Sequence, residues 1–258
     1  DAINSMRDFM TGKKWLPERE GPGPALAFHT PRELATPRGK PPGPDPPARR
    51  CMMVLIGMSD PGLVIWPTHR VLGGMKDYSW EKFTAAASGQ LLVTPARGGL
   101  ESLAGEMMTT TVPPPPLPSN VFGLYDFASG RCAVATLAGH NPLSTRFADK
   151  PRAWQQLDVA IVQHVIVEQI CQPRLNGGAP VKWAFPHTIA EVQEIGRGAV
   201  TGAAGELASP GAAQLAVILR PTPLAAVRDV SRAGHLMPQK STFFYPKLAT
   251  GLFINPLA

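Results

Sequence analysis

Two proline-rich stretches limit which parts of this chain can form regular structure. Prolines recur every few residues over residues 21–47, and a second run fills most of residues 113–118. Because proline has no backbone N–H and a fixed φ, neither a helix nor a sheet ladder persists through such a run. The chain has 258 residues, which is still enough for a sizeable core. We therefore expect a linker or insertion over residues 21–50 and a folded domain over residues 51–258.

Short apolar runs and helical patterns alternate in the rest of the chain. Residues 52–57 and 63–66 predict a hairpin across Ser59-Asp60-Pro61-Gly62, and residues 121–125 and 132–137 predict another across Ser129-Gly130. Strands in hairpins together with separate helices indicate the α+β class, with a mixed or antiparallel sheet and flanking helices. Further strands are expected at residues 181–185, 214–219, 243–245 and 251–254, and helices at residues 76–88, 154–172 ending at Pro173, 189–195, and 223–231 capped by Thr222.

The charge of the chain does not indicate a nucleic-acid-binding protein. Its formal net charge is +6, and Lys plus Arg exceed Asp plus Glu by nine to six in residues 1–50 and by sixteen to thirteen in residues 51–258. Half of the excess therefore lies in the segment expected to be a linker. No basic helix face or Arg-aromatic stripe is visible elsewhere, so binding of nucleic acid is disfavoured.

The cysteines and the apolar runs exclude further classes. Three cysteines, widely spaced and without a C-x-x-C motif, encode neither a disulfide framework nor a cysteine zinc site. The sequence has no apolar run long enough to span a membrane and no secretory signal pattern, so no membrane partner and a cytoplasmic location are expected. No H-x-x-x-H, H-E-x-x-H or Asp-rich loop occurs, and we expect no metal site built from neighbouring residues.

One polar cluster directly follows the apolar run at residues 63–66. It reads Pro67-Thr68-His69-Arg70, and side chains at a strand end are free to converge on a cleft. His69 is a candidate general base or phosphate ligand, and Arg70 a bidentate clamp on phosphate or carboxylate. The structural alternative is a surface histidine beside an arginine that is paired with Asp60 or Asp77.

A second polar cluster lies near the C-terminus, over residues 237–247. Lys240, Lys247, two hydroxyls, a glutamine and a tyrosine fall close together there, which suits an anionic group. The glycines of a phosphate-binding P-loop do not precede Lys240-Ser241, so a Walker-type nucleotide site is excluded. The structural alternative is a strand whose aromatic residues pack inward while its polar residues line a solvated rim.

Four segments are similar to a known family: residues 59–70, 156–159, 219–223 and above all the tail from Met237 to Leu257. In these segments the chain resembles the C-terminal half of the bacterial domain-of-unknown-function family numbered 1015. The resemblance covers residues 51–258 apart from the stretch around residues 89–118.

The resemblance implies a fold and two functions. Family members have an N-terminal ParB-like part with an Asp-Gly-His-His-Arg motif followed by a helix. Residues 2–10 look like that helix, although the motif itself is absent, so residues 1–20 are expected to be the remnant of a missing ParB-like part of a longer protein. ParB-like folds include free-serine kinases, and genes of this family often lie beside genes for serine biosynthesis. The resemblance therefore implies a phosphotransferase or phosphatase acting on a small hydroxy-amino acid such as serine or phosphoserine. The alternative is a ParB-related nucleic-acid or partner-binding module without catalysis.

Together these features predict one anion-binding cleft. We expect the strand end at residues 68–70 and the loop at residues 239–242 to face each other, with a small phosphorylated or anionic ligand as partner. The cofactor is left open, a nucleotide with a divalent metal being one candidate, and the oligomeric state is not predicted. The residues expected to act are His69 and Lys240 in catalysis, and Arg70, Thr68, Gln239, Ser241, Thr242 and Lys247 in binding substrate or phosphate.

Overall fold

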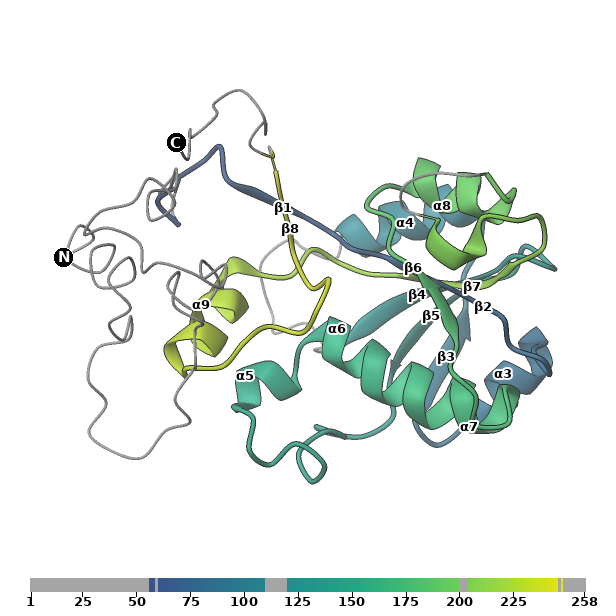
Figure 1. Ribbon diagram of the computed structural model, residues 1–258, viewed down its shortest axis with the longest axis horizontal. Helices are drawn as coiled ribbons and strands as arrows, with labels where there is room; N and C mark the ends of the chain where they lie inside the picture. Colours follow the sequence, from purple (N-terminus) through teal and green to yellow (C-terminus); the bar gives the residue numbers. More distant parts are fainter. Residues whose placement is uncertain (1–55, 59, 110–119, 200–203, 246, 248–258) are drawn as a thin grey trace, which may run out of the picture. The chain divides into compact units, whose positions relative to one another are not determined.

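The computed structural model describes residues 56–58, 60–109, 120–199, 204–245 and 247. The chain divides into two units, one of residues 64–245 and the other of residues 1–63 with residues 246–258. All helices and strands discussed below belong to the unit of residues 64–245 (Figure 1). The strand expected at residues 251–254 lies outside the described residues.

A six-stranded antiparallel sheet forms the centre of this unit, with the strand order β3-β5-β4-β7-β2-β6. This confirms the α+β class, and the expected hairpin across Ser129-Gly130 is present, with Val121 opposite Thr136 and Tyr125 opposite Cys132. Gly130 has a φ of 71°, the conformation that a glycine adopts at little cost in a tight turn. The strands are β2 (Arg70–Gly73), β3 (Leu91–Pro95), β4 (Val121–Asp126), β5 (Cys132–Leu137), β6 (Lys182–Ala184) and β7 (Ala213–Ile218).

Helices cover both faces of the sheet (Figure 1). On one face lie α4 (Leu100–Thr109) and α8 (Ile189–Gly196), packed on a core that includes Val71 of β2. Leu72, the next residue of β2, belongs to the core of the opposite face, as alternation along a strand requires. That face is covered by α3 (Trp80–Ala87), α5 (Arg152–Gln155), α6 (Asp158–Ile161), a π-helix (Val162–Cys171), α7 (Gln172–Leu175) and α9 (Leu224–Arg232).

The expected long helix differs from the sequence prediction at both ends. It is interrupted after Gln155, begins again at Asp158 and runs through the π-helical turns to Leu175. The prediction that Pro173 ends the helix was wrong. Proline needs room beside the carbonyl of the preceding turn, and the wider π-helical turns that come directly before it supply that room.

The strand pairing and one hydrogen bond at the ends of the unit were not predicted. β1 (Val64–Trp66) pairs with β8 (Phe243–Tyr245), and the ring of Trp66 stacks on Tyr245 with 4.5 Å between centroids. The hairpin partner expected for this strand, residues 52–57, lies mostly outside the described residues. Thr222 does not cap α9, because its hydroxyl donates instead to the carbonyl of Ser241, at 2.7 Å.

Candidate functional site

Most of the polar residues singled out above lie at one end of the six-stranded sheet. β2 begins there and β7 ends there, with Arg70 opposite Val217, and the start of β4 lies beside the end of β7, with Gly123 opposite Ile218. Because the strands are antiparallel, the start of one and the end of its neighbour meet at the same edge. The segments that enter and leave these strands therefore come together there.

The segment that follows β7, residues 219–222, connects the others. The backbone N–H of Leu219 donates to Nδ1 of His69, at 3.1 Å. The next residue, Arg220, forms an ion pair with Asp158 at 3.3 Å. Two residues later Thr222 makes the bond to the carbonyl of Ser241 described above. Residues 219–222 thus contact three distant parts of the chain, at His69, Asp158 and Ser241.

Arg70 joins the two predicted clusters. Its Nη1 donates to the carbonyls of Thr68, at 2.7 Å, and His69, at 3.3 Å, and its Nη2 donates to the carbonyl of Lys240, at 2.8 Å. The guanidinium also lies 4.9 Å from the centroid of the Phe185 ring. The two segments predicted to meet, about 170 positions apart, therefore do meet, but through a side chain and a backbone carbonyl.

The charge of Arg70 is buried without an acidic partner in the described part of the chain. The residue is 3% exposed, and none of the described carboxylates forms an ion pair with it. Burial lowers its pKa to about 10, which leaves the guanidinium protonated at neutral pH. Among the described residues, the guanidinium donates to three backbone carbonyls and lies over one aromatic ring.

The loop that contains Lys240 is held in one conformation at this end of the sheet. Lys240 has a φ of 53°, in the left-handed region, and its side chain is exposed. Ser241 is buried, and its carbonyl accepts the hydrogen bond from the hydroxyl of Thr222. Gln239 is exposed and Thr242 is half-buried. Lys247, the other lysine of the predicted cluster, is exposed and belongs to the other unit of the chain, so it is not included in this site.

His69 and Arg70 leave the start of β2 on opposite faces. His69 lies on the same side as Val71 and lines a cavity against Met107 of α4 and Ile189 of α8. Arg70 lies over Phe185, whose ring stacks on Trp183, a residue of the opposite core. The residue that meets the Lys240 loop is therefore Arg70, and the side chain of His69 faces a separate cavity.

The environment of His69 determines its protonation. The residue is 4% exposed, and burial, then the neighbouring His187 and Arg70, lower its pKa to about 4. Because Nδ1 accepts from the Leu219 N–H, the proton of the neutral ring is on Nε2. At neutral pH the ring is thus a hydrogen-bond donor through Nε2, which favours an orienting role over that of a base.

A second polar group at this end was not singled out from the sequence. Asn120 donates to the carboxylate of Asp158, at 2.9 Å, and to the carbonyl of Gln156, also at 2.9 Å, while Arg220 approaches the other carboxylate oxygen. Burial raises the pKa of Asp158 although Arg220 and Asn120 act to lower it. The available signal was that Asp158 and Arg220 both fall in segments that resemble the family.

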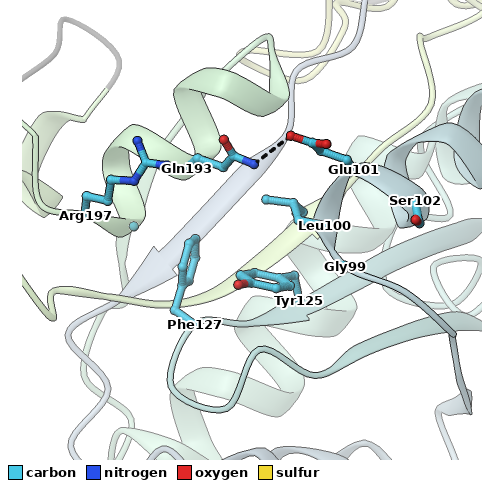
Figure 2. Close-up of a pocket in the computed structure, with 9 residues that line it drawn as sticks. Gly99, Leu100, Glu101, Ser102, Tyr125, Phe127, Gln193 and Arg197 are labelled. Atoms are coloured by element: carbon cyan, nitrogen blue, oxygen red, sulfur yellow. Dashed lines mark hydrogen bonds between the residues drawn. The ribbon is translucent and has the colours of Figure 1, made fainter.

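A larger cavity, of about 500 Å³, lies near the opposite end of the sheet, between the start of α4 and the end of α8 (Figure 2). Gln193 donates to Glu101 across it, at 3.3 Å, beside the rings of Tyr125 and Phe127 (Figure 2). Its charged residues, Glu101 and Arg197, are exposed, so water screens them. This cavity therefore offers a ligand less electrostatic stabilisation than the end with the buried Arg70.

Comparisons with known proteins give one match. The family model described as "Protein of unknown function (DUF1015)" matches residues 25–160. No curated protein and no solved structure matches the chain. Within the described residues, no cluster of three or more His, Cys, Asp or Glu side chains is arranged to hold a metal ion. In that same part of the chain, every helix is too short or too polar to cross a lipid bilayer.

Proposed function

The chain belongs to the DUF1015 family, and we propose that it binds a small phosphorylated ligand where Arg70 meets the Lys240 loop and catalyses phosphoryl transfer on a small hydroxy-amino acid such as serine. The observation that supports this most is the buried charge of Arg70, which no carboxylate among the described residues pairs with. The amino-acid substrate comes from the resemblance to the family.

A buried charge is costly unless it is paired, and carbonyl dipoles offset only part of that cost. An anion bound nearby would recover more of it: opposite unit charges about 4 Å apart attract by about 4 kcal/mol at an effective dielectric constant of about 20. Lys240, whose carbonyl accepts from the guanidinium, has an exposed side chain, and in this proposal that side chain contacts the anion directly. In this proposal Arg70 contributes its field and fixes the loop, and Lys240 makes the contact.

Phosphoryl transfer fits this set of residues because it depends mainly on positioning and on neutralising charge. In the hydrolytic direction a water oxygen forms the new bond to phosphorus, the bond from phosphorus to the serine oxygen breaks, and the proton lost by water is taken up by the serine oxygen. In the alternative transferase reaction the serine oxygen forms the new bond to the γ-phosphorus of a nucleoside triphosphate, the bond from that phosphorus to the bridging oxygen breaks, nucleoside diphosphate leaves, and the serine hydroxyl loses its proton. In this proposal the proton is transferred by Asp158, which contacts Arg220 in the segment that also binds His69 and the Lys240 loop, and whose pKa is raised by burial.

The test is the binding of phosphoserine, measured by calorimetry on the full chain. Lys240→Asn removes the charge with a residue that tolerates the left-handed conformation of this position. It should weaken binding by about 1.5–3 kcal/mol, or roughly tenfold to a hundredfold, which is the range for a hydrogen bond to a charged group. Lys76→Gln is the matched control, because Lys76 is exposed and follows the far end of β2.

Two results would contradict the proposal. One is unchanged affinity in Lys240→Asn, and the other is an equal loss in both variants, which would reflect only the net charge of the chain. Release of phosphate from phosphoserine, and transfer from ATP to serine, are assayed on the same samples. Binding without either reaction would remove the catalytic part of the proposal and leave the binding site.

A further inference from the structure

The cavity that His69 lines is a second place where a ligand fits, separate from the Lys240 loop. It has a volume of about 290 Å³, close to the lower end of the range of about 300–1,000 Å³ for small-molecule sites. We call it the histidine cavity. Its walls include Trp66, His69, Met107, His187, Ile189 and Ile218.

We propose that the histidine cavity binds a small uncharged molecule with an apolar body and one polar group that both accepts and donates a hydrogen bond, such as a carboxamide or a hydroxyl. This inference does not rest on the proposed phosphoryl transfer. It rests on the two imidazole rings and on the apolar walls around them.

His69 supplies a donor. Its ring is held by the bond from the Leu219 N–H to Nδ1, and this bond fixes the proton of the neutral ring on Nε2. No described residue accepts from that Nε2–H, although the residue is only 4% exposed. His69 lines the cavity, so its Nε2–H can donate to an acceptor atom of a ligand bound there.

His187 supplies an acceptor. Its Nδ1 lies 3.2 Å from the carbonyl of Pro67 and 3.4 Å from Oγ1 of Thr68. A carbonyl only accepts hydrogen bonds, so Nδ1 is protonated and the neutral ring has its lone pair on Nε2. Contact with the ring of Phe243, at 3.8 Å between centroids, and a bond from the backbone N–H of His187 to Glu191 hold the residue in place at the start of α8.

The walls exclude a charged ligand. Among the described residues around the cavity, all are apolar except the two histidines and Thr188, and none is Asp, Glu, Lys or Arg. A charge brought into such surroundings loses its hydration without gaining a partner. An apolar molecule with one neutral amide or hydroxyl group matches both the walls and the donor and acceptor.

Benzamide is a suitable probe, because its amide both accepts and donates, and benzamidinium is a charged molecule of nearly the same shape. Binding to the full chain is followed by the shifts of the imidazole nitrogen resonances of His69 and His187. We expect benzamide to shift both, and benzamidinium to bind at least about tenfold more weakly. Failure of benzamide to bind, or equal binding of the two probes, would overturn the proposal.

His69→Asn is the variant that isolates the donor. The amide oxygen of asparagine takes the place of Nδ1 and accepts from the Leu219 N–H, whereas nothing replaces Nε2–H. Benzamide should bind this variant about tenfold more weakly, the effect of one lost hydrogen bond. His140→Asn, at an exposed position in a loop, should bind it unchanged. Equal affinity for the wild type and His69→Asn would refute the role of the donor.

A second variant keeps the test decisive if His69→Asn does not fold. Ile189→Phe adds volume from α8 into the cavity and leaves both histidines in the sequence. Cooperative thermal unfolding with loss of benzamide binding would support the histidine cavity as the site. Unchanged binding would place the probe elsewhere and refute the proposal.

Discussion

The burial of His69 predicts a specific loss of stability in acid. In the folded protein its pKa is lowered to about 4, whereas an exposed histidine has a value near 6.5. Below about pH 6.5 the unfolded chain therefore binds a proton that the folded chain does not bind. Stability decreases as the pH decreases wherever the unfolded state binds more protons than the folded state. Folding therefore becomes less favourable as the pH is lowered from about 6.5 to about 4.

The size of the effect follows from the two pKa values. Between pH 7 and pH 5 this one residue should lower the free energy of unfolding by about 2 kcal/mol, and the loss levels off below about pH 4, where both states are protonated. Asp158 and the other titrating groups contribute their own pH dependence. They are common to the wild type and a His69 variant, so they cancel in the difference between the two proteins.

Urea denaturation of the wild type and His69→Asn at several pH values measures this difference. The variant keeps an acceptor for the Leu219 N–H and has no titrating group at position 69. The stability of the wild type relative to the variant should therefore drop by about 2 kcal/mol from pH 7 to pH 5. Parallel stability curves for the two proteins would show that His69 is not buried as a neutral ring.

Three further substitutions test the packing and the hydrogen bonds around the sheet. Gly73→Ala should destabilise by about 3 kcal/mol or more in urea denaturation, because the new Cβ would lie 2.0 Å from the backbone oxygen of Ala212. Gly130→Ala, with a positive φ but open space around it, should cost only about 1 kcal/mol, and similar costs at the two positions would contradict this explanation. Asn176→Ala removes one hydrogen bond that the side chain accepts and two that it donates to backbone carbonyls. It should therefore lower the free energy of unfolding by about 3 kcal/mol in the same assay. A loss below about 1 kcal/mol would mean that water replaces these hydrogen bonds.

Elements with strong local signals were predictable from the sequence. The β4–β5 hairpin follows from two apolar runs around Ser129-Gly130, and α8 follows from Thr188, which forms a capping box with Glu191. β3 was missed because it ends in Pro95, and a proline argues against a strand. β3 is an edge strand, where the missing N–H is tolerated. The helix α4 was missed because glycines and prolines argue against a helix. A pair of glycines precedes it, a proline run follows it, and Gly105 lies inside it.

The site was predictable in part. The expectation that residues 68–70 and 239–242 meet agrees with the bond from Arg70 to the carbonyl of Lys240. The sequence pattern did not indicate that a new strand begins at Arg70. Side chains alternate between the two faces along a strand, so without that strand boundary the placement of His69 and Arg70 on opposite faces cannot be predicted. The pairing of Asp158 with Arg220 depends on tertiary structure alone, since 62 positions separate the two residues.

The bond between Arg70 and Lys240 also bears on the order in which this protein is assembled. It closes a loop of 170 positions, and the entropic cost of closing so long a loop has to be met before the contact contributes. The sheet contains much shorter closures, such as the β4–β5 hairpin, and these are free to form first. The β4–β5 hairpin can thus form early, whereas the pairing of β2 with β7 and the proposed anion site both join segments far apart in the chain and would be among the last parts of the molecule to form.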